Sequence, residues 1–334
     1  MFESFKKGHL KFLVGVCFDD RNEKLLSYAM KLAEKTGAKL RLTHVVGPGT
    51  EFSWVSSVYG GSVYQPLAKE IQEQTFKESY ERLMELHSKI KGLGEVETNI
   101  SMGTPPEVLS ADAVASGASL ILVGTRINRA KFLPKGFSTS LSLMTHASRP
   151  VMTVPDDVRS VRESGNLKVL YADDLTDHSR DALTVGFEMA YGLENTDFYH
   201  LHICEVEEED LKETQEKMSE MMVMERIPYD EHISKSDPVG KARTKIKEKM
   251  NLRLGGVKFL LQAASCSYIQ KIYFGDVQEQ LHKAVEEIDP DILVFGKHSF
   301  LHRKPFGIGK LPFSAMLSQN RTIVIAPGKK AIVG

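Results

Sequence analysis

The sequence has few cysteines, no long apolar run and no excess of charge of one sign. Three cysteines in 334 residues, with no C-x-x-C spacing, indicate neither a disulfide framework nor a thiolate metal site. The apolar stretch from Phe12 to Phe18 is far shorter than the roughly 20 residues that a membrane span requires. The net charge of -1 gives no general attraction to nucleic acid or to an anionic membrane. We therefore expect a cytoplasmic protein with neither of these partners.

The chain is longer than a typical single domain of about 100 to 200 residues, so two domains are expected. Its 42% hydrophobic and 26% charged residues are ordinary for a globular protein. Each half is long enough to bury its own core.

The sequence repeats itself. Phe12 to Val16 and Lys168 to Ala172 are short apolar runs, and each is followed by acidic or polar residues and then by apolar residues at helical spacing. Later in each half, Gly103 and Gly275 precede a helix, and Gly124 and Gly296 end an apolar run. Both pairs have the same offset, 275 − 103 = 296 − 124 = 172. Equal offsets indicate one unit written twice.

Alternating strands and helices, with strands rich in Val, Ile and Leu, predict an α/β fold with parallel sheets. We expect two consecutive doubly wound, Rossmann-like domains, each with a five-stranded parallel sheet and helices on both faces. The predicted domains are residues 1–156 and 167–334, joined by a linker at 157–166. The predicted strands are 12–16, 39–46, 95–100, 120–124, 151–154, 168–172, 197–203, 268–274, 292–296 and 323–326.

This order of elements resembles the universal stress protein (UspA) family, over nearly the whole chain and in two copies. The resemblance is carried by an acidic turn after the first strand, a strand that ends at His44-Val-Val, a G-x-P or G-D before a helix, and a strand that ends in Val123-Gly-Thr before a long loop. The resemblance implies a tandem stress-response protein.

Members of that family that bind ATP carry G-x-x-G-x9-G-[ST] after the fourth strand and an Asp at the end of the first. Glycines let backbone N–H groups approach phosphate closely, and a following helix N-terminus favours negative charge. In the second half, Asp174 stands at the acidic position, Ser299 replaces the middle glycine and Lys310 replaces the final hydroxyl residue. The resemblance therefore implies a nucleotide site formed by Asp174, Gly296, Ser299, Gly309 and Lys310.

In the first half the family signature is more altered. Cys17 occupies the position of the first-strand Asp, and Ile127 and Phe137 occupy two glycine positions. A second site would be formed by Gly124, Ser138 and Thr139, and the second half is favoured over it.

Three functions follow from this resemblance. The first is a cytoplasmic stress-response module regulated by ATP or another adenine nucleotide, with or without Mg²⁺. The second is an interaction scaffold of the same fold that binds no nucleotide. The third, a slow ATP hydrolase, is the weakest, because the sequence offers no base or Mg²⁺ constellation beyond Asp174.

Paired domains in the family associate through their last strands. In this chain, Val151 to Val154 could pair with Ile323 to Ala326 within one molecule and cover two sheet edges. A homodimer remains compatible with that arrangement.

Other patterns have simpler structural interpretations. Gly307 to Lys310 lacks the spacing of a phosphate-binding P-loop, and Gly136 to Ser140 is not a G-x-S-x-G elbow. His200, His202 and Cys204 share one strand face, but a buried histidine with satisfied hydrogen bonds is favoured over a metal site.

Between residues 205 and 266 the second half carries an insertion. It contains four methionines, for which core packing is favoured, and a basic stretch for which a solvated helix face is favoured. The methionines are Met218, Met221, Met222 and Met224, and the basic residues are Lys241, Arg243, Lys245, Lys247, Lys249 and Arg253.

Overall fold

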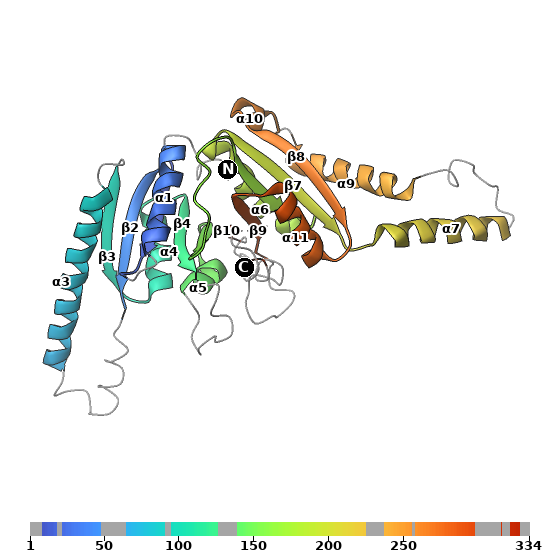
Figure 1. The fold of residues 1–334 in the computed structure, drawn as a ribbon. Helices are drawn as coiled ribbons and strands as arrows, with labels where there is room; N and C mark the ends of the chain where they lie inside the picture. Colours follow the sequence, from blue (N-terminus) through green and yellow to red (C-terminus); the bar gives the residue numbers. More distant parts are fainter. Residues whose placement is uncertain are drawn as a thin grey trace.

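The computed structural model describes residues 9–18, 22–47, 65–90, 95–125, 139–224, 237–255, 258–297, 315 and 321–327. Their strands form one ten-stranded sheet in the order β3-β2-β1-β4-β5-β10-β9-β6-β7-β8 (Figure 1). The first-half strands are β1 (Lys11–Val16), β2 (Lys39–Val46), β3 (Val96–Met102), β4 (Leu120–Thr125) and β5 (Val151–Pro155). The second-half strands are β6 (Leu167–Ala172), β7 (Thr196–Cys204), β8 (Ser267–Phe274), β9 (Ile292–Gly296) and β10 (Thr322–Ala326).

Read from the outer edge of the sheet to its centre, the two halves have the same strand order. Within each half, all neighbouring strands are parallel. The glycines at the 172-residue offset occupy equivalent places. Gly103 and Gly275 both have positive φ (141° and 116°), and their N–H groups donate to Val46 O and Cys204 O, respectively. The predicted α/β fold is confirmed.

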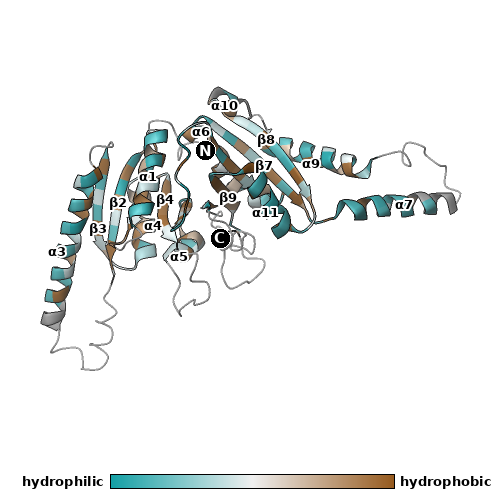
Figure 2. Ribbon diagram, viewed as in Figure 1, coloured by the Kyte–Doolittle hydropathy of each residue, from teal (hydrophilic) through white to brown (hydrophobic). Residues whose placement is uncertain are grey.

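Helices cover both faces of the sheet. One apolar cluster lies between the sheet and the helices α1 (Asn22–Thr36), α3 (Gln65–Ile90), α6 (Arg180–Leu193) and α10 (Lys258–Ala263). A second lies on the other face, under α4 (Pro105–Ala115), α5 (Thr139–His146) and α11 (Val277–Ile288). Figure 2 shows brown, apolar residues gathered on the strands and teal residues on the outer helices. Each cluster contains residues of both halves, so the cores are continuous.

Two of these helices begin as the sequence suggests. The side chain of Asp276 accepts hydrogen bonds from the N–H groups of Gln278 and Glu279, as expected for an N-cap. Thr104 is also at an N-cap position, with Pro105 in the first turn, but its side chain makes no capping hydrogen bond.

The halves meet where β5 pairs with β10. This pairing is antiparallel, with Thr153 opposite Ile323 and Met152 opposite Val324. Every residue of both strands is buried. In this chain, the last strand of each half therefore covers the sheet edge formed by the last strand of the other half.

The segment between β5 and β6 is fastened to both halves. From α1, Lys35 Nζ donates to the backbone oxygens of Arg162 and Gly165, each at 3.0 Å. From the second half, buried Asp291 pairs with Arg159 and Arg162, each at 3.2 Å. The segment that the sequence marks as a linker is thus held by ion pairs and hydrogen bonds along its length.

The insertion forms helices α7 (Glu208–Met224) and α9 (Pro238–Leu254), which extend from the body of the molecule in Figure 1. Core packing was expected for the methionines of α7, and for Met218 this is wrong, because 54% of its surface is exposed. The other three methionine side chains lie outside the described part. In the parts of the chain that the structure describes, no helix has the length and apolar character needed to cross a membrane.

Candidate functional site

Two of the predicted site residues of the second half are described, and they lie close together. Asp174 follows β6 in an exposed turn, where its Oδ1 accepts hydrogen bonds from the N–H and hydroxyl of Thr176 at 2.9 and 2.8 Å. Gly296 ends β9, and the register places Ala172 opposite Phe295. Asp174, two residues after Ala172, and Gly296, one residue after Phe295, therefore lie at the ends of two neighbouring strands. Ser299, Gly309 and Lys310 lie outside the described residues.

This place is a topological switch point of the sheet. Strand β6 has β7 as its neighbour on one side and β9 on the other, so the strand order reverses at β6. Ligands of open α/β sheets bind in the crevice at such points. Helix α6 passes close by, since a β-carbon on Gly296 would lie 3.1 Å from that of Ala182. The glycine is required for this close approach.

The most highly connected side chain at the site is that of Asp173, which the sequence analysis did not single out. Its carboxylate is fully buried. Oδ1 accepts from the Leu175 N–H at 2.9 Å and the Ser179 hydroxyl at 2.7 Å, while Oδ2 accepts from His200 Nε2 at 2.8 Å and Arg253 Nε at 3.0 Å. Burial raises the pKa of this carboxyl, but the bond from His200 and the charge of Arg253 outweigh it, and the pKa lies below its usual value.

The histidine partner of Asp173 is completely buried and has contacts at both ring nitrogens. Because an ionised carboxylate can only accept, His200 donates from Nε2 to Asp173, and its Nδ1 lies 2.9 Å from the Tyr268 hydroxyl. Gln270 in turn donates to that hydroxyl at 3.1 Å. The network therefore runs from the end of β6 across β7 to β8.

The cation of the network comes from the insertion. Besides Asp173, Arg253 of α9 donates to Thr176 O and to the Ser179 hydroxyl, each at 2.8 Å. A solvated face was expected for the basic stretch, and for Arg253 this is wrong, because its side chain is only 6% exposed. The insertion thus stabilises the turn that carries Asp174.

A second residue missed from the sequence is Lys297, which directly follows Gly296. Its side chain is half-buried, and desolvation lowers the pKa of its ammonium group. A partly desolvated cation next to the switch point is suited to binding an anion.

The equivalent place in the first half is built differently. Cys17 is exposed after β1, and its N–H donates to Asn22 Oδ1 at 3.0 Å. Gly124 is exposed near the end of β4, next to Val154 of β5, and Thr139 is the first residue of α5. Ser138 lies outside the described residues. The described part of this site thus has neither a carboxylate at the end of β1 nor a cation beside Gly124.

One element of the site is common to both halves. His44 Nδ1 lies 2.9 Å from Val16 O, and His202 Nδ1 lies 2.8 Å from Asp173 O. The register places His44 opposite Val16, and the β6–β7 register, continued past Ala172, places His202 opposite Asp173. His202, not His200, is therefore the counterpart of His44. Burial lowers the pKa of both histidines. Among the described residues no group of three His, Cys, Asp or Glu side chains could hold a metal ion.

Comparisons with known proteins are consistent with this architecture. The sequence model of the Universal stress protein family matches residues 9–155. A universal stress protein from Archaeoglobus fulgidus has a similar structure, with a TM-score of 0.59 and 14% identity over 98% of this chain and 97% of that one. A putative universal stress protein from Pseudomonas aeruginosa gives a TM-score of 0.52 and 15% identity over 96% and 94%. At such low identity these two similarities show the fold alone. No curated protein sequence is a significant match.

Proposed function

Residues 9–155 belong to the universal stress protein family, and from this premise we propose that the chain is a stress-response protein whose second half binds an adenine nucleotide at the ends of β6 and β9. In this proposal it works in the cytoplasm as a nucleotide-regulated binding or signalling module. The observation that carries the proposal is the exposed carboxylate of Asp174 next to Gly296 and the half-buried ammonium of Lys297, at the switch point of the second half.

The chemistry of these groups suits a nucleotide. A carboxylate such as that of Asp174 accepts hydrogen bonds from ribose hydroxyls or an exocyclic amine, and an ammonium such as that of Lys297 balances phosphate charge. The bound nucleotide would supply its own phosphates and any Mg²⁺. The chain would contribute orientation and charge, through a turn that Arg253 and Asp173 hold in place.

The same geometry argues against Asp173 as the general base of a hydrolase. A general base needs a pKa near the working pH and a free lone pair directed at water. Asp173 is ionised well below that range and already accepts from four neighbouring groups. We therefore place binding ahead of catalysis.

The test begins with mass analysis of any nucleotide released from the purified, denatured protein. ATP, ADP and AMP are then titrated against wild type, Asp174→Ala and Lys297→Gln by calorimetry. Asp177→Ala is the matched control, since Asp177 is exposed in the same turn but does not follow a strand end. We expect each site variant to weaken ATP binding about tenfold, which is 1.4 kcal/mol, and the control to leave it unchanged.

A wild-type protein that releases no nucleotide and binds none of the three would remove this proposal. The scaffold without nucleotide would then be the better description. Equal loss of affinity in Asp177→Ala and Asp174→Ala would show that Asp174 makes no specific contact with the nucleotide.

A further inference from the structure

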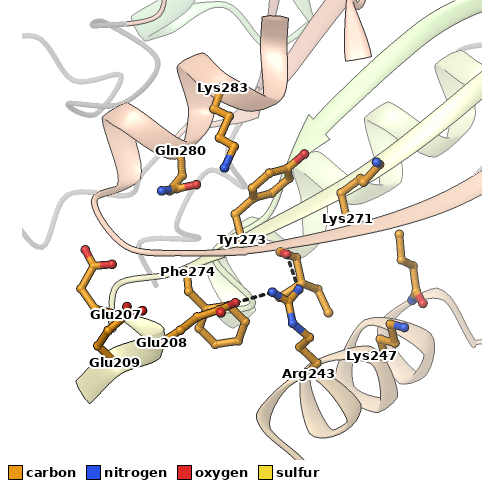
Figure 3. Close-up of a pocket in the computed structure, with 12 residues that line it drawn as sticks. Glu207, Glu208, Glu209, Arg243, Lys247, Lys271, Tyr273, Phe274, Gln280 and Lys283 are labelled. Atoms are coloured by element: carbon orange, nitrogen blue, oxygen red, sulfur yellow. Dashed lines mark hydrogen bonds and ion pairs between the residues drawn. The ribbon is translucent and has the colours of Figure 1, made fainter. Parts of the chain in front are cut away.

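A polar pocket of about 550 Å³ lies at the outer edge of the sheet, beside β8 (Figure 3). Its walls are the edge strand β8, helix α9, helix α11 and the start of α7. This volume is within the usual range of small-molecule sites, about 300 to 1,000 Å³. The insertion supplies two of the walls, through α9 and the start of α7.

One end of the pocket is acidic. Glu207 and Glu209 lie together at the start of α7 (Figure 3). The carboxylate of Glu207 is placed over Gly275, where an added β-carbon would lie 3.0 Å from both of its oxygens. The helix dipole accounts for Glu209 in the first turn of α7, but Glu207 precedes the helix.

The other end of the pocket carries the ammonium group of Lys247, which projects from α9 (Figure 3). Lys283 of α11 lies on the opposite side of β8, beside Gln280 (Figure 3). The neighbouring Lys271 is already paired with Glu287 at 2.7 Å. Within the described part of the chain, Lys247 and Glu207 make no side-chain hydrogen bond or ion pair, so each end has an uncompensated charge.

The middle of the pocket is fixed and partly apolar. Arg243 lies over the Phe274 ring with its guanidinium carbon 4.8 Å from the centroid, donates to Ile272 O at 2.8 Å, and pairs with Glu208 at 2.5 Å. These contacts join α9, α7 and β8, so the walls are held apart without a ligand. Buried Ile272 and Phe274 give the floor an apolar surface.

We propose that this pocket binds a small peptide-like zwitterion, with its ammonium group at Glu207 and Glu209 and its carboxylate at Lys247. A purely anionic ligand would meet repulsion at the acidic end, and a purely cationic one at the basic end. A ligand with opposite charges at the two ends of a short, mostly neutral stem complements both ends of the pocket. The proposal does not depend on nucleotide binding, because none of these residues lies at the ends of β6 or β9.

The experiment uses three probes of one length on the full chain, with affinities measured by isothermal calorimetry. Triglycine carries both charges, N-acetyl-triglycine only the carboxylate, and triglycine amide only the ammonium. We expect triglycine to bind at least tenfold more tightly than either capped form. Equal affinity for the three probes, or no binding of triglycine at about 10 mM, would overturn the proposal.

Charge-neutral variants then assign each end of the ligand. Glu207→Gln should abolish the preference for triglycine over N-acetyl-triglycine, and Lys247→Gln should abolish the preference over triglycine amide. Both side chains are exposed, so the fold should survive, as checked by circular dichroism. The matched controls are Glu216→Gln on α7 and Lys245→Gln on α9, which do not line the pocket and should keep both preferences. Loss of both preferences in a control would contradict the assignment.

Discussion

Arg253→Met tests whether the insertion stabilises the second half through the buried carboxylate of Asp173. The variant keeps the length and apolar stem of the side chain but removes its charge and its hydrogen bonds to Asp173, Thr176 and Ser179. Removing one partner of a buried ion pair costs about 3 to 5 kcal/mol. Because Asp173 keeps its bonds from His200 and Ser179, we expect the lower end, about 3 kcal/mol at pH 7.

The pH dependence follows from the lowered pKa of Asp173. A carboxyl whose folded pKa is depressed stabilises the fold above its unfolded pKa, about 3.9, and this contribution is lost as the pH falls through the folded pKa. Without Arg253 the folded pKa lies higher. The stability difference between wild type and Arg253→Met should therefore be full at pH 7 and should narrow as the pH falls toward the depressed folded pKa of Asp173 in wild type.

The assay is urea denaturation followed by circular dichroism, with Lys245→Met as the control on an exposed face of the same helix. The control should change the free energy of unfolding by less than about 0.5 kcal/mol. A double-mutant cycle with Asp173→Asn should give a coupling energy on the order of 1 to 3 kcal/mol. A coupling energy near zero, or equal effects of Arg253→Met and Lys245→Met, would refute the reasoning.

Three further outcomes can be measured. Glu188 is buried on α6, its Oε1 has no hydrogen-bond partner among the described residues, and burial raises the pKa of its carboxyl to about 7. Wild-type stability should therefore fall as the pH rises from the unfolded pKa, about 4.3, to about 7, and Glu188→Gln should melt higher than wild type at pH 8 and no higher at pH 5. Gly296→Ala should cost roughly 1 to 3 kcal/mol by crowding Ala182, whereas Gly124→Ala, with no atom of the described residues within 4 Å of the added carbon, should cost far less in the same urea assay. Asp291→Ala should remove one of the two carboxylates that pair with Arg159 and Arg162, the other being that of Asp289, and limited trypsin digestion should detect the loosened segment as faster cleavage between β5 and β6.

The fold could be predicted because its signals are local or repeated. Buried parallel strands are continuous apolar runs, and the equal spacing of Gly103 to Gly275 and Gly124 to Gly296 marked equivalent turns. The structure places all ten expected strands within a few residues of their predicted ranges.

The site was less predictable because its key partners are distant in sequence. Of the adjacent residues Asp173 and Asp174, sequence alone favoured the second, yet the buried one is the first. Its cation, Arg253, is 80 residues away, in an insertion that is longer than the corresponding segment of the first half. One signal was available: Asp173 is two residues after Tyr171, so strand alternation directs both to the same face, where Tyr171 contacts His200.

The antiparallel junction of β5 and β10 also affects how the protein responds to dilution. When two separate chains associate through such strands, the paired fraction depends on their concentration. Here both strands belong to one polypeptide and are connected through a fastened segment, so their effective concentration is set by the chain itself. The paired state, with both of its shared apolar clusters intact, should therefore persist at any abundance of the protein in the cell.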